Sequence, residues 1–557
     1  MLQDSISTKQ LKPSPQKPLN DQEKLRKVFK VHTSILNNFP LTYSNLSWSR
    51  YKDILRKSSD QTLKPPASQI LQITPSPFKI SKQPITSTKL NITDNTDLKD
   101  LKKNTEKQSI RKSFTHSRLP TTTMFYETRQ KPQKPFDIWK FNNKVPQTTK
   151  VFIIHGKYQD LRSALLRRGW VENLNNESMF FDLKWARSAR VPFGILDWQL
   201  FNHFPNNLQL TAKWNLCKNI NKLLRKTGSH SCSSFFPRCF KLNDSGFSEF
   251  SEYFKLNFAI SLLKDAVTTP YSIHYEKLGA CIGVCKRWIN RLKLQQAFSD
   301  EDDSKLVLDH DWRILNINDS RLIGCYYARY YKDEDLHAIG KGLLETLKQI
   351  DPQYSINGNK NIWIVKPGHK SRGRNISLHT SLKDIYDFIN TAEYCIVQKY
   401  IENPLLINNK KFDIRLWVLV SSTDPLNIWI FKDCYLRFSV NDYSNTQLGD
   451  LFTHLTNNSI SKKAKGFFDS EIEGCMWSLN SFRGYLVSEH GEDLWESKIF
   501  PQVKRVVIKS ILTVKDLGRK RSFELFGYDL MVDCEFNTWL IEINSSPAMD
   551  YSTVIDR

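Results

Sequence analysis

The fold is decided by a stretch late in the 557-residue chain: residues 523–533 are FELFGYDLMVD, and residues 539–547, after a polar turn, are WLIEINSSP. Apolar and polar residues alternate at a two-residue period in both runs, which predicts a β-hairpin. Asp529 lies on the first strand. Glu542 and Asn544 lie two residues apart on the second, so their side chains are expected to leave the same face.

These three oxygen-bearing side chains form a candidate metal site. Two carboxylates held close together repel each other unless a cation lies between them. Magnesium prefers oxygen ligands, commonly a few carboxylates completed by phosphates and water. Asp529, Glu542 and Asn544 therefore fit a magnesium site that holds a nucleotide triphosphate, and they equally fit a solvated hairpin with ordinary edge charges.

A second candidate element lies upstream, where residues 361–367, NIWIVKP, predict a strand that ends near Lys366. The basic loop GHKSRGRNI follows at 368–376 and contains Arg372 and Gly373. Glycine allows backbone N–H groups to approach phosphate oxygens without a Cβ in the way. Such a loop alone is usually only a turn, and it lacks the Gly-Lys-Ser/Thr sequence of a P-loop.

Three further runs complete the set: YCIVQKYIE at 394–402, KKFDIRLWVLV at 410–420 and HLTNN at 454–458. The first two are predicted strands. Alternation places Lys411, Asp413 and Arg415 on one face of the second strand. A row of this kind suits a cleft for a charged ligand, and it also suits a solvated sheet face with cross-strand pairs.

Together, these runs and the hairpin resemble the tubulin-tyrosine-ligase-like family in order and spacing, over roughly residues 150–557. Members of that family join an amino acid to a carboxylate at the expense of ATP. The resemblance implies an α/β (α+β) fold with an ATP-grasp-like ligase core, and ATP and Mg²⁺ as cofactors. It divides the chain into an N-terminal α/β domain (148–212), a central domain with the nucleotide-binding loop (213–410) and a C-terminal ATP-grasp domain with the metal site (411–557).

The resemblance also assigns roles to residues. Arg415 and Arg437 would face carboxyl groups of the amino acid or acceptor and act in catalysis with Glu542, because arginine grips a carboxylate through two parallel hydrogen bonds. Asp529, Glu542 and Asn544 would bind the metal. The remaining residues would contact the nucleotide, with those at 398–401 lining the adenine pocket: Lys213, Lys366, Arg372, Gly373, Gln398, Lys399, Tyr400, Ile401, Lys411, Asp413, Thr456 and Asn457.

Some of these assignments have plainer alternatives. Lys213 opens a helix predicted from about residue 210 to 224, and a lysine there is usually only solvated. Residues 398–401 also fit an ordinary buried strand. Many relatives carry a second loop glycine two residues after Gly373, where this chain has Asn375.

Residues 400–406, YIENPLL, and 166–172, LRRGWVE, are most similar to the glycine-adding branch of the family. This implies that free glycine is attached to glutamate γ-carboxylates in tubulin tails, through an acyl phosphate and as the initiating step. The implied enzyme is a monomer in the cytoplasm, on the cytoskeleton of cilia or flagella, without nucleic-acid or membrane partners. The alternatives are a glutamate-adding enzyme and a non-catalytic microtubule-binding protein. A nucleic-acid binder, suggested by charge alone, leaves the clustered motifs unexplained.

The composition agrees with an acidic partner, since the net charge is +24 and the pI about 9.4. Residues 1–147 hold 27 Lys and Arg against 11 Asp and Glu. This segment is predicted to be a disordered basic extension, with residues 19–38 as a candidate short helix. It would be an electrostatic tether or an extension without a specific role. The ten cysteines form no CxxC pair and are expected to be reduced thiols. No secretory signal and no 18-residue apolar run is found.

Overall fold

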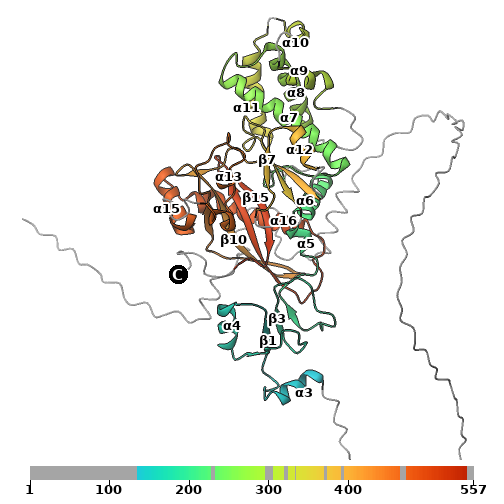
Figure 1. The fold of residues 1–557 in the computed structure, drawn as a ribbon, viewed down its shortest axis with the longest axis vertical. Coiled ribbons are helices and arrows are strands. Elements are labelled where there is room, and N and C mark those ends of the chain that lie inside the picture. The colour runs from blue at the N-terminus through green and yellow to red at the C-terminus, as the bar shows by residue number, and fades with distance from the viewer. Residues whose placement is uncertain are drawn as a thin grey trace, which may run out of the picture.

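The computed structural model describes residues 134–227, 233–294, 305–318, 324–332, 334–368, 373–389, 394–464 and 472–548. Three sheets and a group of helices make up this part of the chain, which confirms the predicted mixed helix and sheet class (Figure 1). The predictions for residues 1–133, including the candidate helix at 19–38, and for Arg372 lie outside the described residues.

A small parallel sheet forms the N-terminal unit, coloured teal in Figure 1. Its strand order is β2-β1-β3-β4, and α4 connects β1 to β2. Phe152, Ile154, Leu165 and Leu183 form its core. The predicted strand, helix and strand are confirmed, with these bounds: β1 (Val151–Ile154), α4 (Gln159–Leu166), β2 (Val171–Glu172), β3 (Leu183–Trp185) and β4 (Leu200–Phe201).

The end of the segment predicted to be disordered is instead ordered. Helix α3 (Pro135–Asn142) lies within residues 1–147, so the prediction was wrong for this part. Its Phe136 ring stacks on Phe180 and on Trp198, with ring centroids 5.9 Å and 5.7 Å apart. These aromatic contacts bury apolar surface, which opposes the entropy of a free chain.

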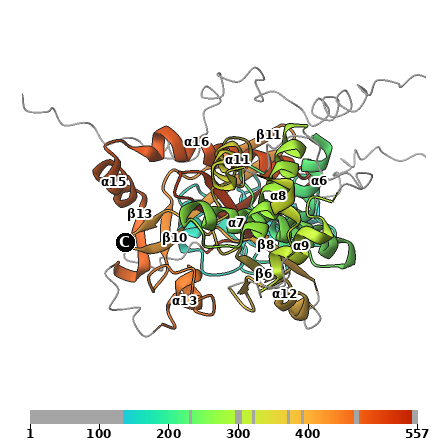
Figure 2. The same ribbon diagram turned by 90° about the horizontal axis from the view of Figure 1, so that it is seen from above.

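The described residues within 244–350 contain five helices. They lie at the end of the molecule opposite the N-terminal unit (Figure 1). The other four pack around α8. The view from above shows α7, α9 and α11 beside it (Figure 2). The predicted helical character of residues 248–347 is confirmed by α7 (Asp244–Thr268), α8 (Tyr275–Lys293), α9 (Asp309–Asn316), α10 (Tyr326–Tyr330) and α11 (Leu336–Ile350).

Every cysteine in the described part of the chain is a free thiol.

The second sheet is antiparallel, with the order β5-β8-β6-β7. It consists of β5 (Cys239–Lys241), β6 (Trp363–Pro367), β7 (Ser377–His379) and β8 (Cys395–Lys399), with α12 (Leu382–Ile389) after β7. The helix predicted over residues 210–224 is two helices, α5 (Leu208–Thr211) and α6 (Lys213–Thr227). Ala212 between them is extended, with φ −82° and ψ 122°, so α6 begins in a new direction at Lys213.

The third and largest sheet has the order β13-β12-β10-β14-β15, and β9 and β11 also pair with β10. Its strands are β9 (Leu406–Ile407), β10 (Lys410–Thr423), β11 (Leu426–Ile430), β12 (Tyr435–Phe438), β13 (Met476–Ser478), β14 (Glu524–Val532) and β15 (Thr538–Ser545). The β14–β15 pair is the predicted hairpin. The other elements here are α13 (Leu451–His454), α14 (Asn458–Ser461), the 3-10 turn η4 (Glu473–Cys475), α15 (Leu479–His490), the π-helical turn η5 (Trp495–Ile499) and α16 (Phe500–Leu512).

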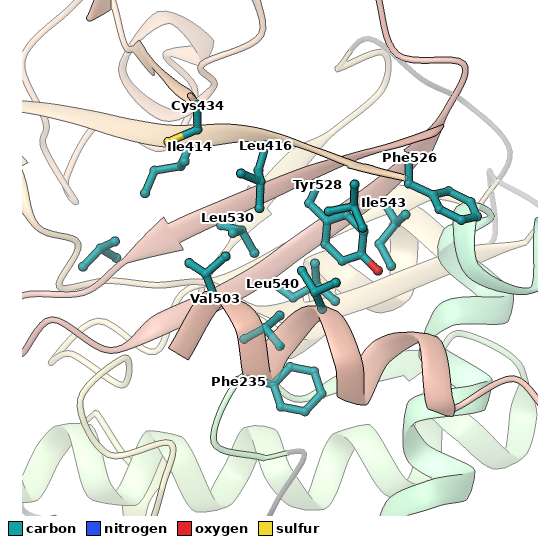
Figure 3. Close-up of a cluster of buried hydrophobic side chains, with 14 of the residues drawn as sticks. Phe235, Ile414, Leu416, Cys434, Val503, Phe526, Tyr528, Leu530, Leu540 and Ile543 are labelled. Atoms are coloured by element: carbon teal, nitrogen blue, oxygen red, sulfur yellow. The ribbon is translucent and has the colours of Figure 1, made fainter. Parts of the chain in front are cut away.

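The two faces of this sheet differ in chemistry. On one face, side chains of β10, β14 and β15 pack against Val503 of α16 and against Phe235 (Figure 3). On the other face lie Asp413, Arg415 and Asp529. A bulge in the hairpin shifts the register between Asp529 and Leu530. As a result Leu540 lies in the apolar core while Glu542, two residues on, lines the cleft on the charged side.

Within the described part of the chain, helices long and apolar enough to span a bilayer are absent.

Candidate functional site

A cleft with two arms runs over the charged face of the large sheet. The inner arm lies against the second sheet and gathers most of the predicted nucleotide contacts: Lys213, Lys366, Gly373, Gln398, Lys399, Tyr400, Ile401, Lys411, Asp413, Thr456 and Asn457, together with Asp529 and Glu542. The outer arm is lined by the other three predicted residues that the structure describes, Arg415, Arg437 and Asn544. Lys213, Asn457 and Glu542 line both arms, so the arms meet there.

The cleft also has lining residues that sequence reasoning missed. Pro237, Ile364, Ile376, Met531 and Ile541 add apolar surface to the inner arm. No sequence signal marks them as cleft residues, because four of them lie next to other apolar residues and Ile376 is a single apolar residue at the end of the basic loop. The outer arm receives Tyr158 and Arg187 from the N-terminal unit, and their contribution depends on tertiary structure alone.

Cations outnumber carboxylates along the two arms. The carboxylates are Asp413, Asp529 and Glu542, and the cations are Lys213, Lys366, Lys399, Lys411, Arg187, Arg415 and Arg437. A cleft lined by one excess sign of charge focuses the field and attracts ligands of the opposite sign. The cleft is therefore suited to a polyanion.

A row of alternating charges crosses strands β12, β10 and β14. Arg437 donates to Asp413 from Nε and Nη2, at 2.7 and 2.6 Å, and its Nη2 also lies 3.0 Å from Asp529. Arg415 grips Asp529 through Nε at 2.6 Å and Nη2 at 3.1 Å. Thr456 donates to Asp413 at 2.7 Å. These contacts use Nε and Nη2 of each arginine, and a guanidinium has five N–H donors in all.

The electrostatics of this row fix the charge of Asp529. Burial alone would raise the pKa of the Asp529 carboxyl, but Arg415 and Arg437 outweigh burial and hold that pKa well below its usual range. Burial is the larger effect for Asp413, whose pKa is raised despite Arg437. Asp529 is thus the firmly ionised member of the row.

Lys366 reaches the inner arm from β6. It is buried, and its Nζ donates to Oε1 of Gln398 at 2.7 Å. The Gln398 amide donates in turn to the carbonyl of Pro237 at 3.3 Å. Burial lowers the pKa of Lys366 to about 8, although Glu542 opposes the shift. Gln398 therefore holds the lysine in place as well as lining the arm.

Lys411 is held by a short chain of hydrogen bonds. Its Nζ donates to the Tyr400 hydroxyl at 2.9 Å and to the His454 carbonyl at 2.8 Å. The Tyr400 hydroxyl lies 3.0 Å from Nδ1 of His454. Burial lowers the pKa of Lys411 to about 7 and, with Lys411 nearby, the pKa of His454 to about 4. An anionic ligand would favour the protonated form of Lys411.

Lys399 differs from the other lysines of the inner arm. Its Nζ forms a buried ion pair with Glu402 and donates to the Ile362 carbonyl at 3.0 Å. Glu402 also accepts from the backbone N–H groups of Lys360 and Ile362, at 3.0 and 2.9 Å. The charge of Lys399 is thus balanced within the protein, and its side chain braces the chain that follows β8.

The loop after β6 is shaped by two residues with positive φ. Gly373 has φ +70°, and a Cβ there would clash with Ile460 and lie 3.3 Å from Oδ1 of Asn457. Asn375, which stands where many relatives have glycine, has φ 56°. Asparagine adopts this left-handed region more readily than most residues. Asn375 therefore supplies the conformation that the second glycine would provide.

The predicted metal ligands lie together between the two arms. Nδ2 of Asn544 lies 3.2 Å from an oxygen of Asp529 and 3.2 Å from one of Glu542. Glu542 is also paired with Lys213 at 2.9 Å. In the described residues no three His, Cys, Asp or Glu side chains form a cluster that could hold a metal ion. Two carboxylates and an amide fit a cation that takes most of its ligands from phosphate and water, as magnesium does.

Comparison with known proteins gives a family for the C-terminal part of the chain. Residues 334–557, which include the charged row, Lys366, Lys411 and the hairpin, match the model of the tubulin-tyrosine ligase family. The chain contains a tubulin-tyrosine ligase family domain. This domain supplies β6 to β15. The residues before it add Tyr158, Arg187, Lys213 and Pro237 to the lining of the cleft.

Three curated relatives resemble most of the chain. Tubulin glycylase 3D of Tetrahymena thermophila is 34% identical over 498 residues, covering 75% of this chain and 48% of the relative. Tubulin monoglycylase TTLL3 of Danio rerio is 32% identical over 512 residues, covering 74% and 65%. Protein monoglycylase TTLL8 of Mus musculus is 29% identical over 503 residues, covering 75% and 60%. The chain spans about half the length of the first of these relatives.

Proposed function

We propose that this protein is an ATP- and magnesium-dependent ligase that attaches glycine to the γ-carboxylates of glutamates in tubulin tails. The observation that carries the proposal is the junction of two charged arms at Lys213, Asn457 and Glu542, within a chain similar to tubulin glycylases. One arm would hold the nucleotide. The other would hold the carboxylate and the amine that are to be joined.

The inner arm suits ATP. Lys366 and Lys411 bring two buried amino groups into the arm from two different sheets, and Gly373 allows close backbone approach. Pro237, Met531 and Ile541 offer apolar surface for a flat base. Asp529, Glu542 and Asn544 would hold magnesium, which, when bound, would neutralise charge on the transferring phosphoryl group.

The outer arm suits carboxylates. Arg415 and Arg437 line it while their Asp529 and Asp413 partners fix the orientation of each guanidinium. A guanidinium that is already fixed loses less conformational freedom on binding a carboxylate than a mobile guanidinium does. Lys213 lies at the junction and pairs with Glu542, so its amino group could contact an anionic group in either arm.

The reaction follows from these parts. A carboxylate oxygen of the acceptor glutamate takes the γ-phosphoryl group of ATP, which gives an acyl phosphate and ADP. The glycine amine then attacks the acyl carbon, the C–N bond forms, phosphate leaves and the amine loses a proton. The protein contributes positioning and charge neutralisation, with no covalent intermediate on a side chain. Attachment to unmodified glutamate makes this the initiating step.

The setting of the reaction follows from the substrate. Tubulin tails are polyanionic, and a chain of net charge +24 would be steered to them at low ionic strength. We propose the microtubule cytoskeleton of cilia or flagella as the site of action, and a monomer as the active form.

A labelled-substrate assay tests the proposal. The protein is incubated with microtubules, ATP and magnesium, and with either labelled glycine or labelled glutamate. We expect glycine to enter tubulin, with one ADP released per glycine. Glutamate incorporation in its place would move the protein to the glutamate-adding branch. Microtubule binding without incorporation of either amino acid would contradict the ligase proposal.

The pKa values of the two lysines predict a pH dependence for nucleotide binding. Lys411 and Lys366 have pKa values lowered by burial to about 7 and about 8, and a bound triphosphate raises both. Binding therefore takes up protons above pH 7, and affinity falls as pH rises. From pH 7 to pH 9 we expect Kd for a non-hydrolysable ATP analogue to rise about ten- to a hundredfold.

Calorimetry in buffers of different ionisation enthalpy measures both the Kd and the protons taken up. Lys411→Met should weaken binding at pH 7 and remove part of the slope. A Kd that is constant between pH 7 and pH 9, without proton uptake, would show that the lysines do not bind the phosphates.

A further inference from the structure

Arg187 is a cation of the outer arm that the reaction above does not use. It follows β3 of the N-terminal sheet and lines the outer arm together with Tyr158 of the same N-terminal unit. The tubulin-tyrosine ligase family match begins only at residue 334. The N-terminal unit therefore adds a positive group to a cleft that is built mainly by another part of the chain.

The backbone of Ala186 and Arg187 is held by hydrogen bonds to polar side chains, of which Asn202 and His203 are buried. The N–H of Ala186 donates to Oδ1 of Asn202 at 2.7 Å, and Nδ2 of Asn202 donates back to the Ala186 carbonyl at 2.9 Å. Nε2 of His203 lies 2.9 Å from the same carbonyl. The Ser546 hydroxyl donates to the Arg187 carbonyl at 3.3 Å. Because Asn202 and His203 are buried, water does not compete for these bonds.

The hydrogen bonds around Ala186 and Arg187 are linked through His203 to β14, the strand that carries Asp529. Nδ1 of His203 lies 2.9 Å from Glu524, the first residue of β14. Glu524 is fully buried and also accepts from the Phe204 N–H at 2.8 Å and from Asn207 at 2.5 Å. The backbone of Arg187 is thus held at a fixed position relative to the charged row, although the Arg187 side chain is exposed.

The space around the Arg187 side chain is shaped by Gly156 and Tyr158. Gly156 has φ +115°, and a Cβ there would lie 3.1 Å from the Tyr158 ring and 3.7 Å from Cδ of Arg187. The Tyr158 ring packs edge-on against Trp185, with centroids 5.7 Å apart. In contrast to Arg415 and Arg437, Arg187 forms no side-chain ion pair with another described residue.

We propose that Arg187 is a specificity-determining residue that binds an acidic side chain of the acceptor segment next to the glutamate being modified. This inference rests on the proposed function. Arg187 lines the outer arm and not the inner arm, which separates it from the nucleotide lysines. The backbone of Arg187 is fixed, and its guanidinium is open to solvent. This arrangement suits a second carboxylate of the acceptor segment that lies at a fixed spacing from the carboxylate that reacts.

Kinetics with two acceptor peptides test the inference. One peptide carries a glutamate flanked by glutamates, and the other carries the same glutamate flanked by glutamines. For Arg187→Ala we expect KM for the acidic peptide to rise about tenfold, with kcat changed less than about twofold, because the lost contact is charged but solvent-exposed. The neutral peptide should be almost unaffected, so the preference for acidic flanks is lost. Arg187→Lys should restore part of it.

Arg190→Ala is the matched control, because Arg190 is an exposed arginine of the same loop that does not line either arm. Equal KM increases in the two alanine variants would overturn the inference. They would show that the acidic peptide is attracted by the overall positive charge of the protein and not by a contact with Arg187. A fall in kcat without a KM change would overturn it too, by placing Arg187 at the reacting atoms. The Kd of the ATP analogue should be the same in all variants.

Failure of the proposed function is visible separately. Wild-type protein that incorporates no glycine refutes the ligase proposal, whatever Arg187 does. Binding of the two peptides by fluorescence anisotropy does not need turnover. If wild-type protein binds the acidic peptide no more tightly than Arg187→Ala does, the role of Arg187 is wrong even where glycine is incorporated.

Discussion

Glu542→Gln is expected to lower the rate of glycine incorporation by about two to three orders of magnitude, with little change in stability. Glu542 lies where the two arms meet, beside Asn544 and paired with Lys213. The substitution keeps the shape of the side chain but removes one of the two carboxylates that would hold magnesium. Losses of this size are typical when one preorganised electrostatic contact to a transition state is removed.

The stability expectation follows from exposure. The Glu542 side chain is 20% exposed and its lysine partner 13% exposed, so water screens part of their interaction. We expect Tm to change by about 2 °C or less. Glu535→Gln, in the hairpin turn and paired with Lys348, is the matched control and should retain full activity. Activity within twofold of wild type in Glu542→Gln would remove this residue from the site.

Asp529→Ala is expected to cost about 3–5 kcal/mol of unfolding free energy, the range found when one partner of a buried ion pair is removed. Asp529 accepts from both Arg415 and Arg437, whose side chains are 11% and 7% exposed. Without Asp529, Arg415 loses its aspartate and Arg437 keeps only Asp413. Urea unfolding measures the loss.

Asp442→Ala supplies the comparison for this measurement. Asp442 pairs with Lys410 at 2.9 Å, but its side chain is 67% exposed, so its loss should cost less than about 1 kcal/mol. Equal losses in the two variants would contradict the structural importance of the charged row.

Acid should affect wild-type protein and Asp529→Ala differently. The pKa of Asp529 is depressed in the folded state, so its contribution is complete above the unfolded pKa of about 3.9 and is lost as pH falls through the folded value. Wild-type stability should therefore fall more steeply below pH 4 than that of Asp529→Ala.

Strands of the large sheet could be predicted because the alternation of polar and apolar residues is visible within each strand's own sequence. Alternation in β10 places Lys411, Asp413 and Arg415 on one face, and the structure has them there. The hairpin was predicted from the same signal. The bulge in β15 was not, because one extra residue leaves no mark in an alternating sequence. In an unbroken strand Glu542 would face the core with Leu540.

Other features depend on contacts between distant segments. The break at Ala212 that directs Lys213 toward Glu542 is invisible in a continuous helical pattern. Gln398 was predicted as a lining residue, and its bond to Lys366 could be found only from the fold. Helix α3 was missed because its stabilising rings, Phe180 and Trp198, lie about 40 to 60 residues away in sequence.

The contact between His203 and Glu524 joins residues 321 positions apart. At a synthesis rate of about 5–20 residues per second, Glu524 leaves the ribosome roughly 15 to 60 s after His203. During that interval the Asn202–Asn207 loop has polar side chains whose buried partner does not yet exist. The N-terminal unit therefore reaches its final set of buried hydrogen bonds only after β14, at the far end of the chain, has been translated.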